Sequence, residues 1–149
     1  MIRRSFPAET YLGKVTEFDE EFSEELREDQ SPIDDDFHLY QDLKGRKWTD
    51  VPHSLLESQP DGFVLLTNEA FVAFLAAWLM YSLTSMYAEN EVRNFIIYSF
   101  EHTLRQFRFL NREQRLTVRS LLAEFVRNGT VPFVSQCAAK AVALIDSCD

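Results

Sequence analysis

One stretch, residues 63–87, is the densest apolar segment of the chain and limits what the remainder can fold into. Helical spacing of three and four places Phe71, Phe74 and Trp78 on one face, while alanine, valine and methionine fill most of the remaining circumference. A helix that is apolar nearly all round either is buried at the centre of a protein or spans a membrane. The uninterrupted apolar run covers only residues 70–81, which is shorter than the roughly 20 residues that a span requires. The sequence therefore predicts a buried central helix over about residues 68–87.

Side chains that cap helices mark where two of the helices begin. Thr67 can accept a hydrogen bond from a free amide of the first turn of the central helix, and Glu69 suits the positive end of that helix. Further on, Asn111 and Gln114 have the spacing of a capping box, with asparagine in the Ser/Thr position. We expect one helix to begin after each of these signals.

Length and charge restrict the class of protein. The chain has 149 residues, with 15 lysines and arginines against 24 aspartates and glutamates, for a formal net charge of −9. This length predicts one domain over residues 1–149. The negative charge argues against binding to nucleic acid or to an anionic membrane surface, because positive charge drives both. The N-terminus lacks the apolar run of a secretory signal, and Cys137 and Cys148 are too far apart on one helix to pair, so we expect a cytoplasmic protein.

The N-terminal part predicts an amphipathic helix over about residues 8–28, entered at Ser5 and Pro7. Its apolar stripe carries Tyr11, Val15, Phe18, Phe22 and Leu26, and its opposite face is acidic. Gly13 weakens the first turns, so a start after this glycine stays open. Residues 29–36, with one proline and an acidic run, predict a surface connection.

The remaining pattern predicts further short helices. Residues 35–44 form one helix that Gly45 ends, and Trp48 is expected to cover the central helix. Thr49 or Asp50 would cap a turn that carries two leucines, and residues 94–100 are predicted as helix, although they are rich enough in β-formers to be a strand. An alanine-rich last helix begins near Pro132. The fold class is therefore all-α, a compact bundle of five or six helices around the central one.

No motif in the sequence specifies a reaction. The acidic run at residues 34–36 fails as a calcium loop, because Leu39 and Gly45 stand where the loop requires glycine and glutamate. His38, His53 and His102 lack the spacing of metal ligands, so we predict neither a metal site nor a cofactor. The chain also lacks the glycine-rich, nucleophile-elbow and zinc-protease motifs.

Five arginines recur at helical spacing and would form a basic stripe on one continuous helix: Arg105, Arg108, Arg112, Arg115 and Arg119. The Asn111 cap predicts that a turn divides this stripe. We expect its partner to be the acidic N-terminal helix of the same chain, with a phosphate or nucleic-acid site as the alternative.

Several segments resemble a widespread bacterial family of domains of unknown function. They are the turn at residues 45–48 that ends in Trp48, the segment 50–52, the entry to the aromatic helix at residues 66–79, and residues 110–115. The resemblance covers roughly residues 40–145 and implies no catalytic residues. The family often has a proline where Ala76 stands, so a kink at that point is not expected here.

Three functions stay open. The first is a non-enzymatic protein that binds a protein partner, as an adaptor or a toxin antidote does. The second is an enzyme or small-molecule binder whose polar site is assembled from scattered residues, for which the candidates are Asp35, His38, Trp48 and Arg112. The third is a helical homo-oligomer that associates through the alanine-rich last helix.

Overall fold

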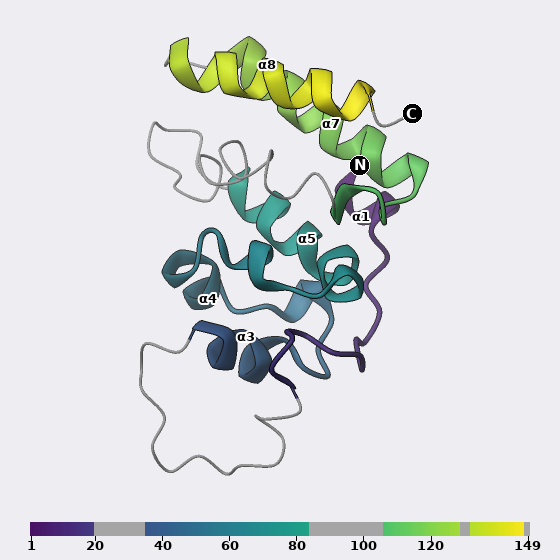
Figure 1. Ribbon diagram of the computed structural model, residues 1–149, viewed down its shortest axis with the longest axis vertical. Coiled ribbons are helices and arrows are strands. Elements are labelled where there is room, and N and C mark those ends of the chain that lie inside the picture. Colours follow the sequence, from purple (N-terminus) through teal and green to yellow (C-terminus); the bar gives the residue numbers. More distant parts are fainter. Residues whose placement is uncertain (20–34, 84–105, 129–131, 148–149) are drawn as a thin grey trace.

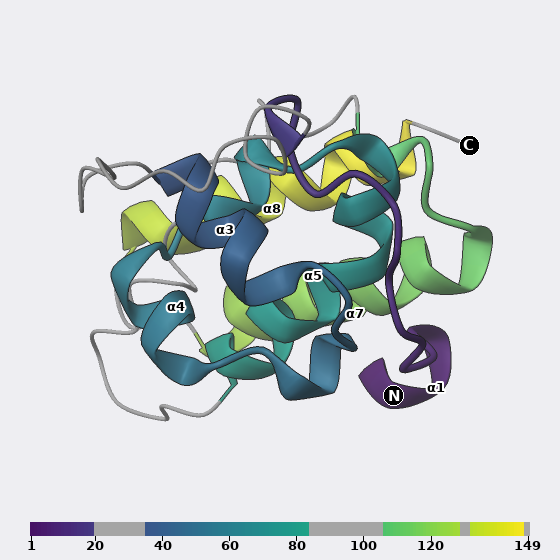
Figure 2. The ribbon, with the colours of Figure 1, turned by 90° about the horizontal axis from the view of Figure 1, so that it is seen from below.

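Helix α5 (Asn68–Ser82) lies at the centre of the protein, between the α7–α8 pair on one side and α3 with α4 on the other (Figures 1 and 2). The computed structural model describes residues 1–19, 35–83, 106–128 and 132–147. The other α-helices in these ranges are α1 (Ile2–Ser5), α3 (Asp35–Leu43), α4 (His53–Ser58), α7 (Arg112–Asn128) and α8 (Pro132–Asp146). Two 3-10 turns, η1 (Trp48–Asp50) and η2 (Gly62–Leu65), complete the described structure, which contains no strand. The predicted compact all-α bundle of five or six helices is confirmed.

The central helix is buried because its side chains are apolar on every side. Nine of its residues are buried, among them Phe71, Phe74 and Trp78. Thr67 caps it as predicted, since its hydroxyl accepts a hydrogen bond from the amide of Ala70 at 3.2 Å. Residues 84–87, the last part of the predicted helix, lie outside the described ranges. No helix within those ranges is long and apolar enough to cross a bilayer.

Helices α7 and α8 form a hairpin in which α8 runs back along α7 (Figure 1). The capping box at the start of α7 is confirmed: Asn111 Oδ1 accepts from the Gln114 amide at 2.8 Å, and Gln114 Oε1 accepts from the Asn111 amide at 2.9 Å. Ala138 and Ala141 of α8 are buried in the core, so part of the alanine-rich surface is used within the chain.

The predicted N-terminal helix over about residues 8–28 is wrong in its first part. The first helix is α1, which Ser5 ends rather than begins, and residues 6–18 are not helical. Their backbone groups bond to distant segments instead: the Tyr11 amide donates to Arg46 O, the Gly45 amide donates to Tyr11 O, and Val15 O accepts from the Thr67 amide. These long-range bonds replace the bonds of a helix. Residues 20–28 lie outside the described part of the chain.

The segment from α3 to α4 follows the prediction except for one cap. Helix α3 ends before Gly45, whose φ of 72° is the left-handed conformation expected after a helix. Trp48 is buried on η1, which packs against α5, and thus covers the central helix as predicted. The predicted cap by Thr49 or Asp50 is wrong, because both belong to η1 and α4 begins after Pro52 without a side-chain cap. Residues 94–100 lie outside the described ranges.

Candidate functional site

The structure does not bring together the four residues predicted for a polar site. Asp35 and His38 lie on α3, whereas exposed Arg112 begins α7 on the opposite side of α5 (Figure 1). Trp48 is buried, and its indole N–H donates to Phe6 O at 2.8 Å. These residues therefore do not form one site.

The remaining histidines and acidic residues do not create a metal centre within the described residues, where no group of three potential ligands occurs. His53 is exposed and its ring lies 5.4 Å from that of Tyr81, edge to face. The Tyr81 hydroxyl donates to Glu57 Oε1 at 2.8 Å. Partial desolvation, this hydrogen bond and the charge of Glu57 raise the pKa of Tyr81. His102 lies outside the described ranges.

The arginine series is divided, as the Asn111 cap predicts. Arg115 donates to the carbonyl of Leu110 at 2.9 Å, at the turn before α7. Arg119 forms two hydrogen bonds with the Asp146 carboxylate, at 2.6 and 3.1 Å, which lower the pKa of Asp146. The partner of Arg119 is therefore α8, not an N-terminal helix. Arg105 lies outside the described residues.

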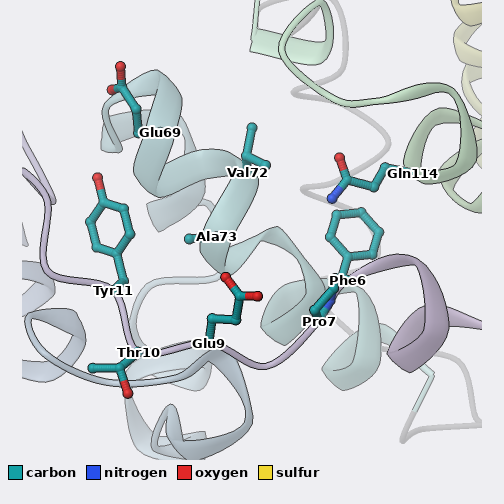
Figure 3. A pocket seen from close by; sticks show the side chains of 9 residues that line it. All are labelled: Phe6, Pro7, Glu9, Thr10, Tyr11, Glu69, Val72, Ala73 and Gln114. Carbon is teal, nitrogen blue, oxygen red and sulfur yellow. The ribbon is translucent and has the colours of Figure 1, made fainter.

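A hollow of about 230 Å³ lies where the N-terminal segment crosses α5 (Figure 3). The N-terminal segment contributes Glu9 and Tyr11 to its lining, together with Phe6, Pro7 and Thr10. Helix α5 contributes Glu69, Val72 and Ala73, and α7 contributes Gln114. Figure 3 shows the Tyr11 hydroxyl and Glu69 at one end, Phe6 and Gln114 at the other, and Glu9 between them.

Tyr11 is fixed in this site by its backbone, its ring and its hydroxyl. Its ring packs edge to face on Phe74 with centroids 5.4 Å apart, and its hydroxyl donates to Lys14 O at 2.6 Å. Burial raises the pKa of Tyr11, and the negative charges of Glu69 and Asp19 raise it further, against an opposing contribution from the Thr67 hydroxyl. The phenol is therefore a neutral group of the hollow.

The segment beside the hollow is held by a buried carboxylate. Asp19 is only 4% exposed, and its two oxygens accept from the amides of Val15 and Thr16, each at 2.7 Å. Lys44 Nζ lies 3.1 Å from Asp19 Oδ2 and neutralises its charge. Thr67 connects the same segment to α5, since its hydroxyl donates to Lys14 O at 2.6 Å.

Two carboxylates of the hollow are not neutralised in this way. Glu9 and Glu69 are exposed, and within the described structure neither forms an ion pair or a hydrogen bond through its carboxylate. Among the described residues, no lysine or arginine lines the hollow. The site is therefore a shallow surface with negative charge above the apolar side chains of Val72 and Ala73.

Gln114 adds a hydrogen-bond donor to the same surface. This residue is 6% exposed, and its Oε1 is occupied by the Asn111 amide. Its Nε2 has no acceptor among the described residues, and Figure 3 shows this atom directed toward the hollow. The site thus offers acceptors at one end and a donor at the other.

Sequence reasoning missed this site because it predicted a helix over residues 8–18. On a helix, Glu9 and Tyr11 would lie on different faces. The available signal was Gly13, which disfavours a regular helix across this segment. No local sequence pattern indicates that Gln114 of α7 lines the same hollow.

Comparisons of the chain with protein-family models, with curated proteins and with solved structures find no match.

Proposed function

We propose that this chain is a non-enzymatic cytoplasmic protein that binds a protein partner, as an adaptor or an antidote does. Its net charge of −9 supports a partner other than nucleic acid or an anionic membrane, because both of these attract positive charge. Its likeness to the bacterial family of domains of unknown function is part of the same proposal.

The hollow beside α5 is the observation that supports a protein partner best. Protein interfaces combine an apolar centre with a polar rim. Here Val72 and Ala73 lie beside Glu9 and Glu69, which form no ion pair with any described residue. A volume of about 230 Å³ is smaller than the roughly 300–1,000 Å³ of pockets that enclose a whole small-molecule ligand. The hollow suits a side chain projecting from a larger molecule.

Site-specific photo-crosslinking tests this proposal. A photoreactive residue at Val72 reports on the hollow, and the same residue at Ala123 is a matched control, since it lies half-buried on α7 and does not line the hollow. In cells of the source organism we expect one protein to crosslink at Val72 and not at Ala123. Ala73→Arg, which fills the hollow, should abolish that product. The absence of a Val72 product, or its persistence in Ala73→Arg, would refute the proposal.

Self-association is the second candidate, and a separate hollow of about 360 Å³ favours it. There Met1 of the N-terminal segment is 72% exposed and Leu116 of α7 is 50% exposed. Light scattering would detect a dimer, and Leu116→Lys should return such a dimer to a monomer. A monomeric parent protein at high concentration would exclude this candidate.

A further inference from the structure

The first six residues, called the arm below, insert into the protein body through specific side chains. Ile2, Ser5 and Phe6 are each at most 5% exposed, and α1 packs against α7 and α5. The Ser5 and Thr117 hydroxyl oxygens lie 2.6 Å apart, and Phe6 O accepts from the Trp48 indole at 2.8 Å. The surface of α5, α7 and η1 that receives the arm is therefore a specific seat for these six residues.

The link between the arm and the body has few contacts. Residues 7–10 are all exposed, and none of their backbone groups forms a hydrogen bond with a described residue. The hollow of about 230 Å³ separates this link from α5, and Figure 3 shows the link crossing the hollow from Pro7 to Thr10. The next backbone bond is that of the Tyr11 amide to Arg46 O. No hydrogen bond among the described residues thus holds the backbone of the link in place.

The charge of the arm suits the seat of any copy of the chain. The arm carries Arg3 and Arg4 and no acidic residue, which is +2 of the formal net charge of −9 and leaves −11 on the remaining residues. Arg4 lies 3.7 Å from Glu113 of α7. Because opposite charges attract, the arm is attracted to the body of its own copy and to that of another copy. Every copy offers an identical seat, so the arm meets the same contacts in either one.

We propose that two copies of this chain exchange their arms, so that the arm of each copy occupies the seat of the other. Such an exchange keeps the contacts of the arm and changes the path of the link, which is why exchange of an identical element is a low-cost route to a dimer. This dimer differs from association through exposed Leu116, because it uses the buried face of the arm. It does not depend on the proposed protein partner, which the Val72 crosslink tests separately.

The length of the link sets the concentration at which the exchange occurs. A short flexible link gives an arm an effective concentration of about 1 mM at the seat of its own copy. The arm of a second copy competes equally only near that concentration. We therefore expect a monomer far below the mM range and a large fraction of dimer near about 1 mM.

Disulfide formation between two differently substituted copies tests the exchange. One copy carries Ser5→Cys and the other carries Thr117→Cys, and in both copies Cys137 and Cys148 are replaced by serine. Neither copy contains a second thiol, so the two thiols meet at the seat only when the arm of the first copy occupies the seat of the second. On a non-reducing gel we expect a covalent heterodimer whose fraction rises about tenfold for each tenfold rise in concentration below the mM range.

A mixture of the Ser5→Cys copy with an Asp61→Cys copy in the same serine background is the matched control. Asp61 is exposed and precedes η2, which packs against α3 rather than at the seat, so this mixture reports crosslinks formed by collision. Equal yields of heterodimer in the two mixtures would overturn the inference. The absence of a heterodimer between the Ser5→Cys and Thr117→Cys copies at about 1 mM would overturn it as well.

A shortened link provides a second measurement in which the seat is unaltered. Deleting residues 8–10 leaves Pro7 alone to cross the hollow, so the arm no longer reaches the seat of its own copy, and short links promote exchange. We expect light scattering to show a dimer of this variant far below the mM range. Adding Ile2→Asp, which places a charge at a buried position of the arm, should return it to a monomer. A monomeric deletion variant, or a dimer that persists with Ile2→Asp, would contradict the exchange.

Discussion

Replacing Asp19 by alanine should destabilise the protein more than any other exchange of a charged residue in the described segment 1–19. The Asp19 carboxylate accepts two short hydrogen bonds from the amides of Val15 and Thr16, both of which are fully buried. Hydrogen bonds to a charged group contribute about 1.5–3 kcal/mol each. Alanine also leaves both amides without an acceptor and Lys44 without its partner. We therefore expect Asp19→Ala to lower the free energy of unfolding by about 3–4 kcal/mol.

Asp19→Asn keeps one acceptor oxygen and places an N–H₂ group against the second amide. We expect it to lower the free energy of unfolding by about half as much as alanine does. Glu17→Ala is the matched control, because Glu17 is exposed on the same segment and its replacement should change stability by less than about 0.5 kcal/mol.

Urea denaturation followed by circular dichroism measures these differences, and the midpoint of a thermal melt should fall by about 6–15 °C for Asp19→Ala in a chain of this size. The amides of Val15 and Thr16 should also lose their hydrogen-exchange protection. If Asp19→Ala were as stable as Glu17→Ala, the Asp19 carboxylate would not stabilise the segment around Val15 and Thr16, and the role given to it would be wrong.

Two further predictions concern close packing and ionisation. A Cβ at Gly62 would lie 3.2 Å from both Leu39 Cδ2 and Gln59 Cβ, and Leu39 is fully buried. Gly62→Ala should therefore lower the free energy of unfolding by about 1 kcal/mol. Equal stability of the variant and the parent protein in urea would contradict this prediction. Because the pKa of Tyr11 is raised in the folded protein, the resulting stabilisation is present below the unfolded value of about 10 and is lost as the pH rises through the folded value. Tyr11→Phe should therefore remove a late-titrating phenol from the absorbance at 295 nm and reduce the loss of stability above pH 10. An unchanged titration curve would refute the assignment.

Local sequence signals predicted the parts of the fold that depend on neighbours in the chain. The central helix was predictable because a helix that is apolar nearly all round is buried whichever element covers it. The Thr67 cap and the Asn111–Gln114 box are interactions between residues three positions apart, so sequence spacing suffices to identify them.

The N-terminal segment and the candidate site depend on distant partners, which explains why they were not predicted. The spacing of Tyr11 and Val15 fits a helix, and both side chains do pack on the core, but their backbone groups bond to the Gly45 turn and to Thr67. No pattern within residues 8–18 encodes these partners. The same holds for Gln114, which only the packing of α7 brings beside Glu9.

The pairing of α1 with α7 has a consequence for synthesis of the chain. The Ser5 hydroxyl lies 2.6 Å from that of Thr117, a residue 112 positions later. At about 5–20 residues per second, roughly 6–22 s separate the translation of the two residues. During that interval Ile2 and Phe6, both buried in the finished protein, lack the helix that later packs beside them. The side of the N-terminal segment that α7 covers therefore stays open in the nascent chain until α7 has emerged, although α5, which α1 also contacts, is made earlier.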